Sequence, residues 1–265
     1  MKFHPLSLGL LILPFVAGTA LAHSPYLKPN TFTADARLDH VTVEAAFAEG
    51  ALRPEIAMKA DGWAVIAPDG TRTALTPAAA LKDATFLEVP LPQDGTYRIT
   101  SGERMGRIAK AGLKGGALRF IEGNEGAKDG ETLVDVQSVT RADVYVTRGK
   151  PSPAGNPTGF EKGVEIHPTT APNDIYAGEA IILTVRDSGT PVAGAAITVM
   201  RDGDMYESQK TPELQLTSDA NGAFRFTPKT AGLYLVQTRV RNAAPGNPNL
   251  WISHTATLTL EVLPQ

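Results

Sequence analysis

The histidines are the residues of this chain whose type best suits metal chemistry. The 265 residues include five histidines and no cysteine. Disulfides, thiolate metal sites and cysteine nucleophiles are therefore excluded, and a metal ion would be held by histidine, carboxylate, methionine or the chain terminus. The sequence contains neither an H-E-x-x-H nor a G-x-S-x-G motif, so a helical zinc-protease site and a hydrolase nucleophile elbow are excluded as well.

The first 22 residues predict a cleaved secretory signal. Lys2 gives a basic start, a short apolar run follows from Leu6, and Ala20-Leu21-Ala22 matches the small-residue exit of such signals. The apolar run is too short to span a bilayer comfortably, and no later stretch reaches spanning length. We therefore expect an exported, periplasmic protein without an integral membrane segment in its mature chain.

Cleavage after Ala22 would make His23 the first residue of the mature protein. An N-terminal histidine offers its free amine and a ring nitrogen together, a pair of ligands that suits divalent copper or nickel. The alternative is that the residue after the signal is arbitrary and solvated. These two interpretations remain open at the level of His23 alone.

Two further histidines are candidate ligands. His254 enters the last predicted strand in phase with Ala256, Leu258 and Leu260, so it lies on the apolar face as a buried imidazole or as a ligand at the sheet end. His167 precedes a proline and is therefore predicted to lie in an extended segment. The candidate metal ligands are accordingly His23, His254 and His167.

The elements that must position these residues are predicted to be β-strands. Short alternating or β-branched runs recur along the chain between Gly, Pro, Asn and Asp residues, and this pattern is typical of antiparallel sandwiches. The predicted fold class is all-β, with two antiparallel sandwiches of immunoglobulin-like or transthyretin-like type in tandem. The predicted organisation is a signal peptide at 1–22, an N-terminal sandwich at 23–148, a Pro/Gly-rich linker at 149–163 and a C-terminal sandwich at 164–265.

Charge narrows the range of partners. The formal net charge is −3, which disfavours nucleic acid as a partner because nucleic-acid binding normally requires a clustered basic surface. Glycines and basic residues do accumulate between residues 101 and 130. That segment is interpreted either as a mobile loop that attracts anions or as a solvated excursion from the first sandwich, and the second interpretation is preferred because no phosphate-binding glycine motif is present.

Nine short motifs distributed over nearly the whole mature chain resemble one family. They are Ala22–Pro29, Lys59–Gly70, Leu91–Ile99, Glu165–Pro168, Ala171–Glu179, Gly189–Ala195, Ser218–Phe224, Ala231–Val236 and Ser253–Leu260. Together they look like an exported family of unknown function that is named for its association with nickel-uptake systems. That family often has His-Pro-Asn-Asp where this chain has Ala171-Pro-Asn-Asp, so one ligand position is missing and His167 is the nearest substitute.

The resemblance implies a periplasmic protein that captures a transition metal and hands it over without catalysis. Nickel, cobalt, copper, zinc and iron are the candidate metals, and an outer- or inner-membrane metal transporter is the implied partner. The alternative is a non-enzymatic envelope module that binds a protein or carbohydrate. A copper-dependent polysaccharide oxidase is the least favoured hypothesis, because two Trp residues in the chain give a poor surface for sugar stacking.

The predicted processing site can be tested directly. When the full chain is exported with its own leader, we expect the mature protein to begin at His23 and to have 265 − 22 = 243 residues. N-terminal sequencing and intact-mass measurement of the exported protein check this. A mature protein that begins at any other residue would remove the N-terminal histidine ligand.

Overall fold

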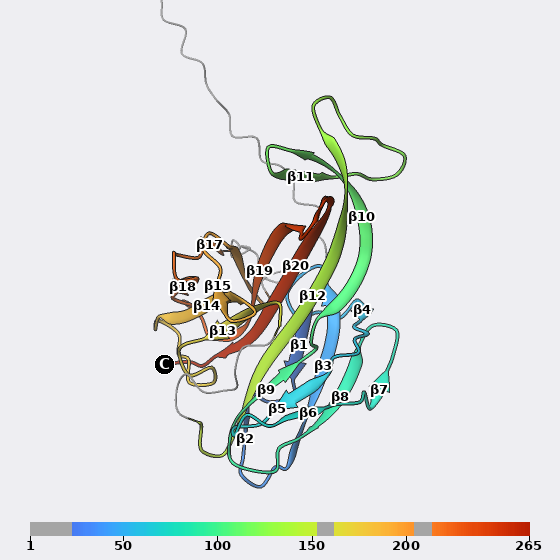
Figure 1. The fold of residues 1–265 in the computed structure, drawn as a ribbon. Coiled ribbons are helices and arrows are strands. Elements are labelled where there is room, and N and C mark those ends of the chain that lie inside the picture. Colours follow the sequence, from blue (N-terminus) through green and yellow to red (C-terminus); the bar gives the residue numbers. More distant parts are fainter. Residues whose placement is uncertain (1–22, 153–161, 204–213) are drawn as a thin grey trace, which may run out of the picture.

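The protein is built from β-strands. The computed structural model describes residues 23–152, 162–203 and 214–265. Within these ranges the chain forms strands, turns and bends, and there is no helix that could span a membrane. The sequence-based prediction of an all-β fold with antiparallel sandwiches is confirmed (Figure 1).

The strands form three sheets. The N-terminal sheet contains β1 (Ser24–Pro29), β3 (His40–Ala48), β4 (Ile56–Ala57), β7 (Ala79–Ala80) and β8 (Thr85–Pro90). The central sheet contains β2 (Thr33–Ala34), β5 (Ala64–Ile66), β6 (Arg72–Ala74), β9 (Gly95–Thr100), β10 (Arg104–Lys114), β11 (Ala117–Phe120), β12 (Thr132–Arg148), β16 (Ala196–Arg201), β17 (Leu214–Thr217), β19 (Gly232–Ala244) and β20 (Asn247–Val262). The C-terminal sheet contains β13 (Val164–Pro168), β14 (Ile181–Asp187), β15 (Thr190–Pro191) and β18 (Ala223–Phe226).

The central sheet joins the two halves of the chain. β20, from the C-terminal half, pairs with β19 in antiparallel fashion and with β12 in parallel fashion, so it lies between them. The parallel register begins at Asp135 opposite Leu250 and continues to Val144 opposite Thr259. In Figure 1 these long strands run side by side through the middle of the molecule. A single sheet therefore forms one wall of both sandwiches.

The side chains of β12 point alternately to the two faces of the central sheet, and each face packs against a different hydrophobic core. Ala142, Val144 and Val146 pack with Leu27, Val43 and other residues of the N-terminal sheet. Tyr145, one residue out of phase, packs with the C-terminal sheet. Successive side chains of a strand point to opposite faces, so the N-terminal and C-terminal sheets cover opposite faces of the central sheet. We refer to these as the N-terminal face and the C-terminal face.

Much of the basic, glycine-rich segment between residues 101 and 130 forms a β-hairpin of β10 and β11, and residues 121–130 form no strand. β10 also pairs along β12, with a bulge between Met105 and Ile108. This hairpin extends the central sheet beyond both sandwiches (Figure 1). Gly112 is paired with Leu133 and Arg119 inside β10, where backbone pairing outweighs the low strand propensity of glycine, whereas Gly106 lies at the bulge. Of the predicted linker at 149–163, residues 153–161 lie outside the described residues, and the division into two domains stays a prediction.

A buried leucine tests whether the two sandwiches unfold together. Leu183 in β14 is fully buried in the C-terminal core, so Leu183→Ala is expected to cost about 2–5 kcal/mol of unfolding free energy. Because the sheet is shared, we expect the urea midpoint reported by Trp63, which is buried in the N-terminal core, to fall together with the far-UV circular dichroism midpoint. A Trp251→Phe background leaves Trp63 as the only tryptophan, since the chain has two.

The neighbouring residue Ile182 provides the matched control. Its side chain is 45% exposed, so Ile182→Ala should leave both midpoints close to those of the parent protein. An unchanged Trp63 transition in the Leu183→Ala variant, with a separate early transition by circular dichroism, would show that the sandwiches unfold independently.

Candidate functional site

His23 lies at the start of β1 and faces a carboxylate. Its Nε2 is 3.0 Å from Glu55 Oε2, and the two side chains are 41% and 28% exposed. Glu55 is held at this position because its backbone N–H donates to the Phe47 carbonyl oxygen, next to the point where β4 pairs with β3. A carboxylate on Nε2 fixes the ring orientation and leaves Nδ1, the nitrogen nearer the main chain, available.

His254 lies in β20 and faces a different carboxylate. Its Nδ1 is 3.6 Å from Glu103 Oε1, and its side chain is 20% exposed. Ala256, Leu258 and Leu260 are buried in the C-terminal core, which confirms that His254 is in phase with an apolar face of its strand.

The structure does not bring the three predicted ligands together. Thr257 of β20 donates to the Pro25 carbonyl oxygen, at 2.8 Å, so β1 and the adjacent His23 lie on the N-terminal face. His254 alternates with Thr257 and points to the C-terminal face. His167 is buried in β13 of the C-terminal sheet. In the part of the chain that the structure describes, no group of three or more His, Asp or Glu side chains could hold a metal ion.

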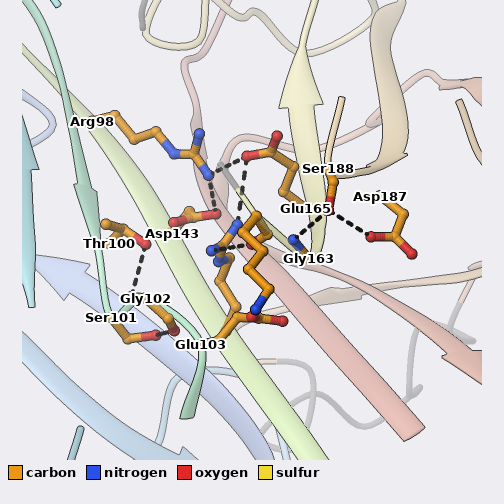
Figure 2. A network of polar contacts seen from close by, with 12 residues as sticks. Arg98, Thr100, Ser101, Gly102, Glu103, Asp143, Gly163, Glu165, Asp187 and Ser188 are labelled. Atoms are coloured by element: carbon orange, nitrogen blue, oxygen red, sulfur yellow. Dashed lines mark hydrogen bonds and ion pairs between the residues drawn. The ribbon is translucent and has the colours of Figure 1, made fainter. Parts of the chain in front are cut away.

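A buried cluster of charges connects the central sheet to the C-terminal sheet. Nη2 of Arg98 in β9 donates to Asp143 Oδ2 in β12, at 2.8 Å, and to Glu165 Oε2 in β13, at 2.6 Å. Arg141 Nη1 is 3.7 Å from the same Glu165 oxygen. Figure 2 shows Arg98 pointing toward both carboxylates, one from each sheet. All four side chains are at most 4% exposed, so their charges interact in a medium that screens them far less than water does.

Burial and charge oppose each other at this cluster. Burial raises the pKa of Glu165, the attraction of Arg98 only partly opposes that shift, and the nearby negative charge of Asp143 raises the pKa further. Arg98 is itself desolvated, but the two carboxylates together raise its pKa well above the usual value. The cluster therefore holds Arg98 firmly charged, while Glu165 is the member whose proton affinity is increased by folding.

A small pocket lies beside the charge cluster. It has a volume of about 340 Å³ and is lined by Gly62, Arg72, Gly102, Glu103, Arg141 and Lys162. The two glycines are needed because their backbones touch: a Cβ on Gly62 would lie 3.0 Å from Gly102 Cα, and a Cβ on Gly102 would lie 2.9 Å from Gly62 Cα. The lining carries charges of both signs, and Glu103 connects it to His254.

The charge cluster was missed by the sequence analysis, although a signal for it exists. Asp143 stands between Ala142 and Val144, and Arg98 between Tyr97 and Ile99, so each charge interrupts a strand that is apolar on both sides. A charge within a strand buried on both faces needs a buried partner. That rule identifies Arg98 and Asp143 as cluster members, but it does not identify Glu165, which comes from another sheet.

Comparison with known families places the chain in one of them. The model of a family described as a domain of unknown function, DUF4198, matches residues 20–242. The chain belongs to this family. The match includes His23 and His167 and ends before His254. No curated protein matches the chain.

Solved structures resemble the chain only in general architecture. The D0-D1 domain of intimin is 12% identical, with a TM-score of 0.22 over 89% of this chain and 97% of that chain. The chicken CNTN1 FN1-FN3 domains are 8% identical, with a TM-score of 0.23 over 90% and 98%. A DUF4785 family protein from Legionella pneumophila is 8% identical, with a TM-score of 0.25 over 80% and 50%. The intimin and CNTN1 domains are immunoglobulin-like and fibronectin-like neighbours, and at these TM-scores none of the three structures carries a functional argument.

The raised pKa of Glu165 predicts a pH dependence of stability. A carboxylate whose pKa is higher in the folded than in the unfolded protein contributes stability at low pH, and this contribution is lost as the pH rises from the unfolded value, near 4.5, through the folded value. Replacing Glu165 by Gln removes that titration. We therefore expect Glu165→Gln to be less sensitive than the parent protein to a rise in pH over this window.

Urea unfolding at a series of pH values from about 4 to about 8 measures this effect. The exposed Glu179 provides the control, and Glu179→Gln should retain the pH dependence of the parent protein. If Glu165→Gln and the parent protein give parallel curves, Glu165 does not titrate differently in the two states.

Proposed function

We propose that the protein is an exported binder of divalent transition metals whose primary ligand is His23. The single observation that supports this is the position of the His23 ring, with Nε2 held 3.0 Å from Glu55 Oε2. Metal-binding histidines commonly donate their second ring N–H to a carboxylate, which sets the tautomer and the ring orientation. With Nε2 engaged in this way, Nδ1 is the ring nitrogen that can bind a metal.

The predicted cleavage after Ala22 would complete the donor set. The freed amine of His23 and its Nδ1 would close a six-membered chelate on one metal ion, and both are nitrogen ligands of the type that copper, nickel, cobalt and zinc accept. Two protein nitrogens leave the other coordination positions to water or to a receiving protein. Such a partly open site suits capture and hand-over, and the resemblance to a nickel-associated family supports nickel uptake or handling, with a membrane metal transporter as the partner.

His254 and His167 have other roles in this proposal. His254 lies on the opposite face of β20 from β1 and contacts Glu103, and His167 is buried in β13. Neither shares a site with His23 in the folded chain. They serve the structure, and the metal-binding assignment depends on His23 and its orienting carboxylate.

Titration calorimetry with Ni²⁺ and Cu²⁺ tests the proposal on the protein that begins at His23. We expect saturable binding that is lost in His23→Ala and is weakened about 10- to 100-fold in Glu55→Gln, the usual range for loss of an orienting partner. His254→Ala is the matched control and should bind as the parent protein does. Affinity should fall as the solution is acidified, because protons compete with the metal for the nitrogen ligands.

A protein that retains about ten residues of the leader provides a second control, because its His23 has no free amine. Binding that is equally strong in this protein, or unchanged in His23→Ala, would rule out the N-terminal chelate.

One observation favours a second candidate function, that of an interaction module of the envelope. Met105 and Ile108 lie on β10 and Leu133 lies near the start of β12, and they are 64%, 61% and 50% exposed. Their register with β12 and β10 places all three on the C-terminal face of the sheet. A photo-crosslinker at position 108 should then give one defined crosslinked product in producing cells, and a crosslinker at the exposed Ile182 should not.

A further inference from the structure

The N-terminal face of the central sheet carries two neighbouring arginines, and no Asp or Glu of the described residues is their ion-pair partner. Arg239 and Arg241 are two residues apart on β19 and therefore point to the same face. They lie opposite Thr255 and Ser253 of β20 in the register. Arg239 Nε donates to Thr255 Oγ1 at 3.2 Å, and Arg241 Nε donates to Ser253 Oγ at 3.3 Å. We call these four residues the arginine–hydroxyl patch.

The two guanidiniums are positioned but not neutralised. Their Nε atoms are held by the hydroxyls, and the carbon of the Arg241 guanidinium lies 5.3 Å from the centre of the Phe120 ring. Burial lowers the pKa of both arginines, and for Arg239 the neighbouring Arg241 lowers it further. Among the described residues, no Asp or Glu forms an ion pair with either arginine. Arg239 is partly buried and Arg241 is exposed, and the repulsion between these two neighbouring like charges would be relieved by an anion that contacts both.

Other unused hydrogen-bond donors border the patch. Thr140 of β12 is paired with Thr255, and Trp251 lies two residues from Ser253 on the same side of β20. Within the described chain, the Thr140 hydroxyl and the Trp251 indole N–H are buried and have no hydrogen-bond partner. Buried polar groups are normally satisfied, so two unpaired donors beside the guanidiniums mark a polar region that the described chain does not satisfy by itself.

We propose that the arginine–hydroxyl patch binds a phosphate-class dianion, either free phosphate or the phosphate group of a small ester. Arginine guanidiniums match phosphate oxygens in geometry and in charge, and two of them neutralise a dianion. Residues two apart on a strand are separated by about 6.6–6.8 Å, so both arginine heads can reach one tetrahedral ion. Phe120 and Trp251 provide an apolar border that an ester could contact.

The site is independent of the metal proposal. It uses neither His23 nor Glu55, and phosphate binding can be measured in metal-free buffer. Loss of metal binding and loss of phosphate binding are therefore distinguishable outcomes.

Titration calorimetry with inorganic phosphate tests the inference, using the chain that begins at His23 in metal-free buffer at constant ionic strength. We expect saturable binding of phosphate. Arg241→Gln, and the double variant Arg239→Gln with Arg241→Gln, should weaken it at least about tenfold, because each removes charge-assisted hydrogen bonds to the ion. Arg225→Gln is the matched control, since Arg225 is exposed on the C-terminal sheet, and it should bind as the parent protein does.

Two further measurements keep the test decisive. Arg239→Lys preserves the charge but not the planar fork, and it should still lose affinity while the far-UV circular dichroism spectrum stays that of the parent protein. Glycerol phosphate distinguishes the two sources: tighter binding than phosphate indicates an ester ligand, and equal or weaker binding indicates the free ion. Absence of saturable binding, or equal binding by the parent protein and the folded Arg241→Gln variant, would overturn the proposal.

Discussion

The parallel pairing of β12 with β20 is the constraint on which the rest of the structure depends. It inserts the last strand between β12 and β19, so that one sheet serves two sandwiches. Every residue on these strands is thereby assigned to a face by its parity. Ala142 and Val144 reach the N-terminal core, whereas Tyr145 and Leu258 reach the C-terminal core. The same parity separates His254 from β1 and places Thr255 beside Arg239.

The charge cluster shows how such an assembly fixes the C-terminal sheet against the central one. Hydrophobic contacts hold two sheets together, but they only weakly favour one relative position of the two sheets over another. Arg98 restricts the relative position of the two sheets, because its Nη2 donates both to Asp143 in the central sheet and to Glu165 in the C-terminal sheet. Buried ion pairs add little net stability, since desolvation offsets their attraction. In this protein the cluster is best understood as a means of setting the position of β13.

Sequence reasoning predicted the all-β fold and the face of His254, because the alternation of apolar and polar residues along a strand is visible within a short stretch of sequence. It also predicted strands at several of the observed positions, such as His40–Phe47 within β3. It did not predict that β12 and β20 pair, because that contact joins residues more than 100 positions apart and depends on no local pattern. Without that strand pairing, the sequence could not show that His23, His254 and His167 lie on different parts of the fold. For the same reason it could not show that Arg239 lies beside Thr255.

The position of β20 has a consequence for the order in which the chain acquires its structure. This strand, Asn247–Val262, is the last one in the described chain, yet it lies in the interior of the central sheet and contacts β12 and β19 along most of its length. Because a chain is synthesised from its N-terminus, the central sheet lacks this interior strand until residues 247–262 have been made. The buried residues of the N-terminal core all precede β20, whereas the C-terminal core takes Ala256, Leu258 and Leu260 from it and therefore closes late.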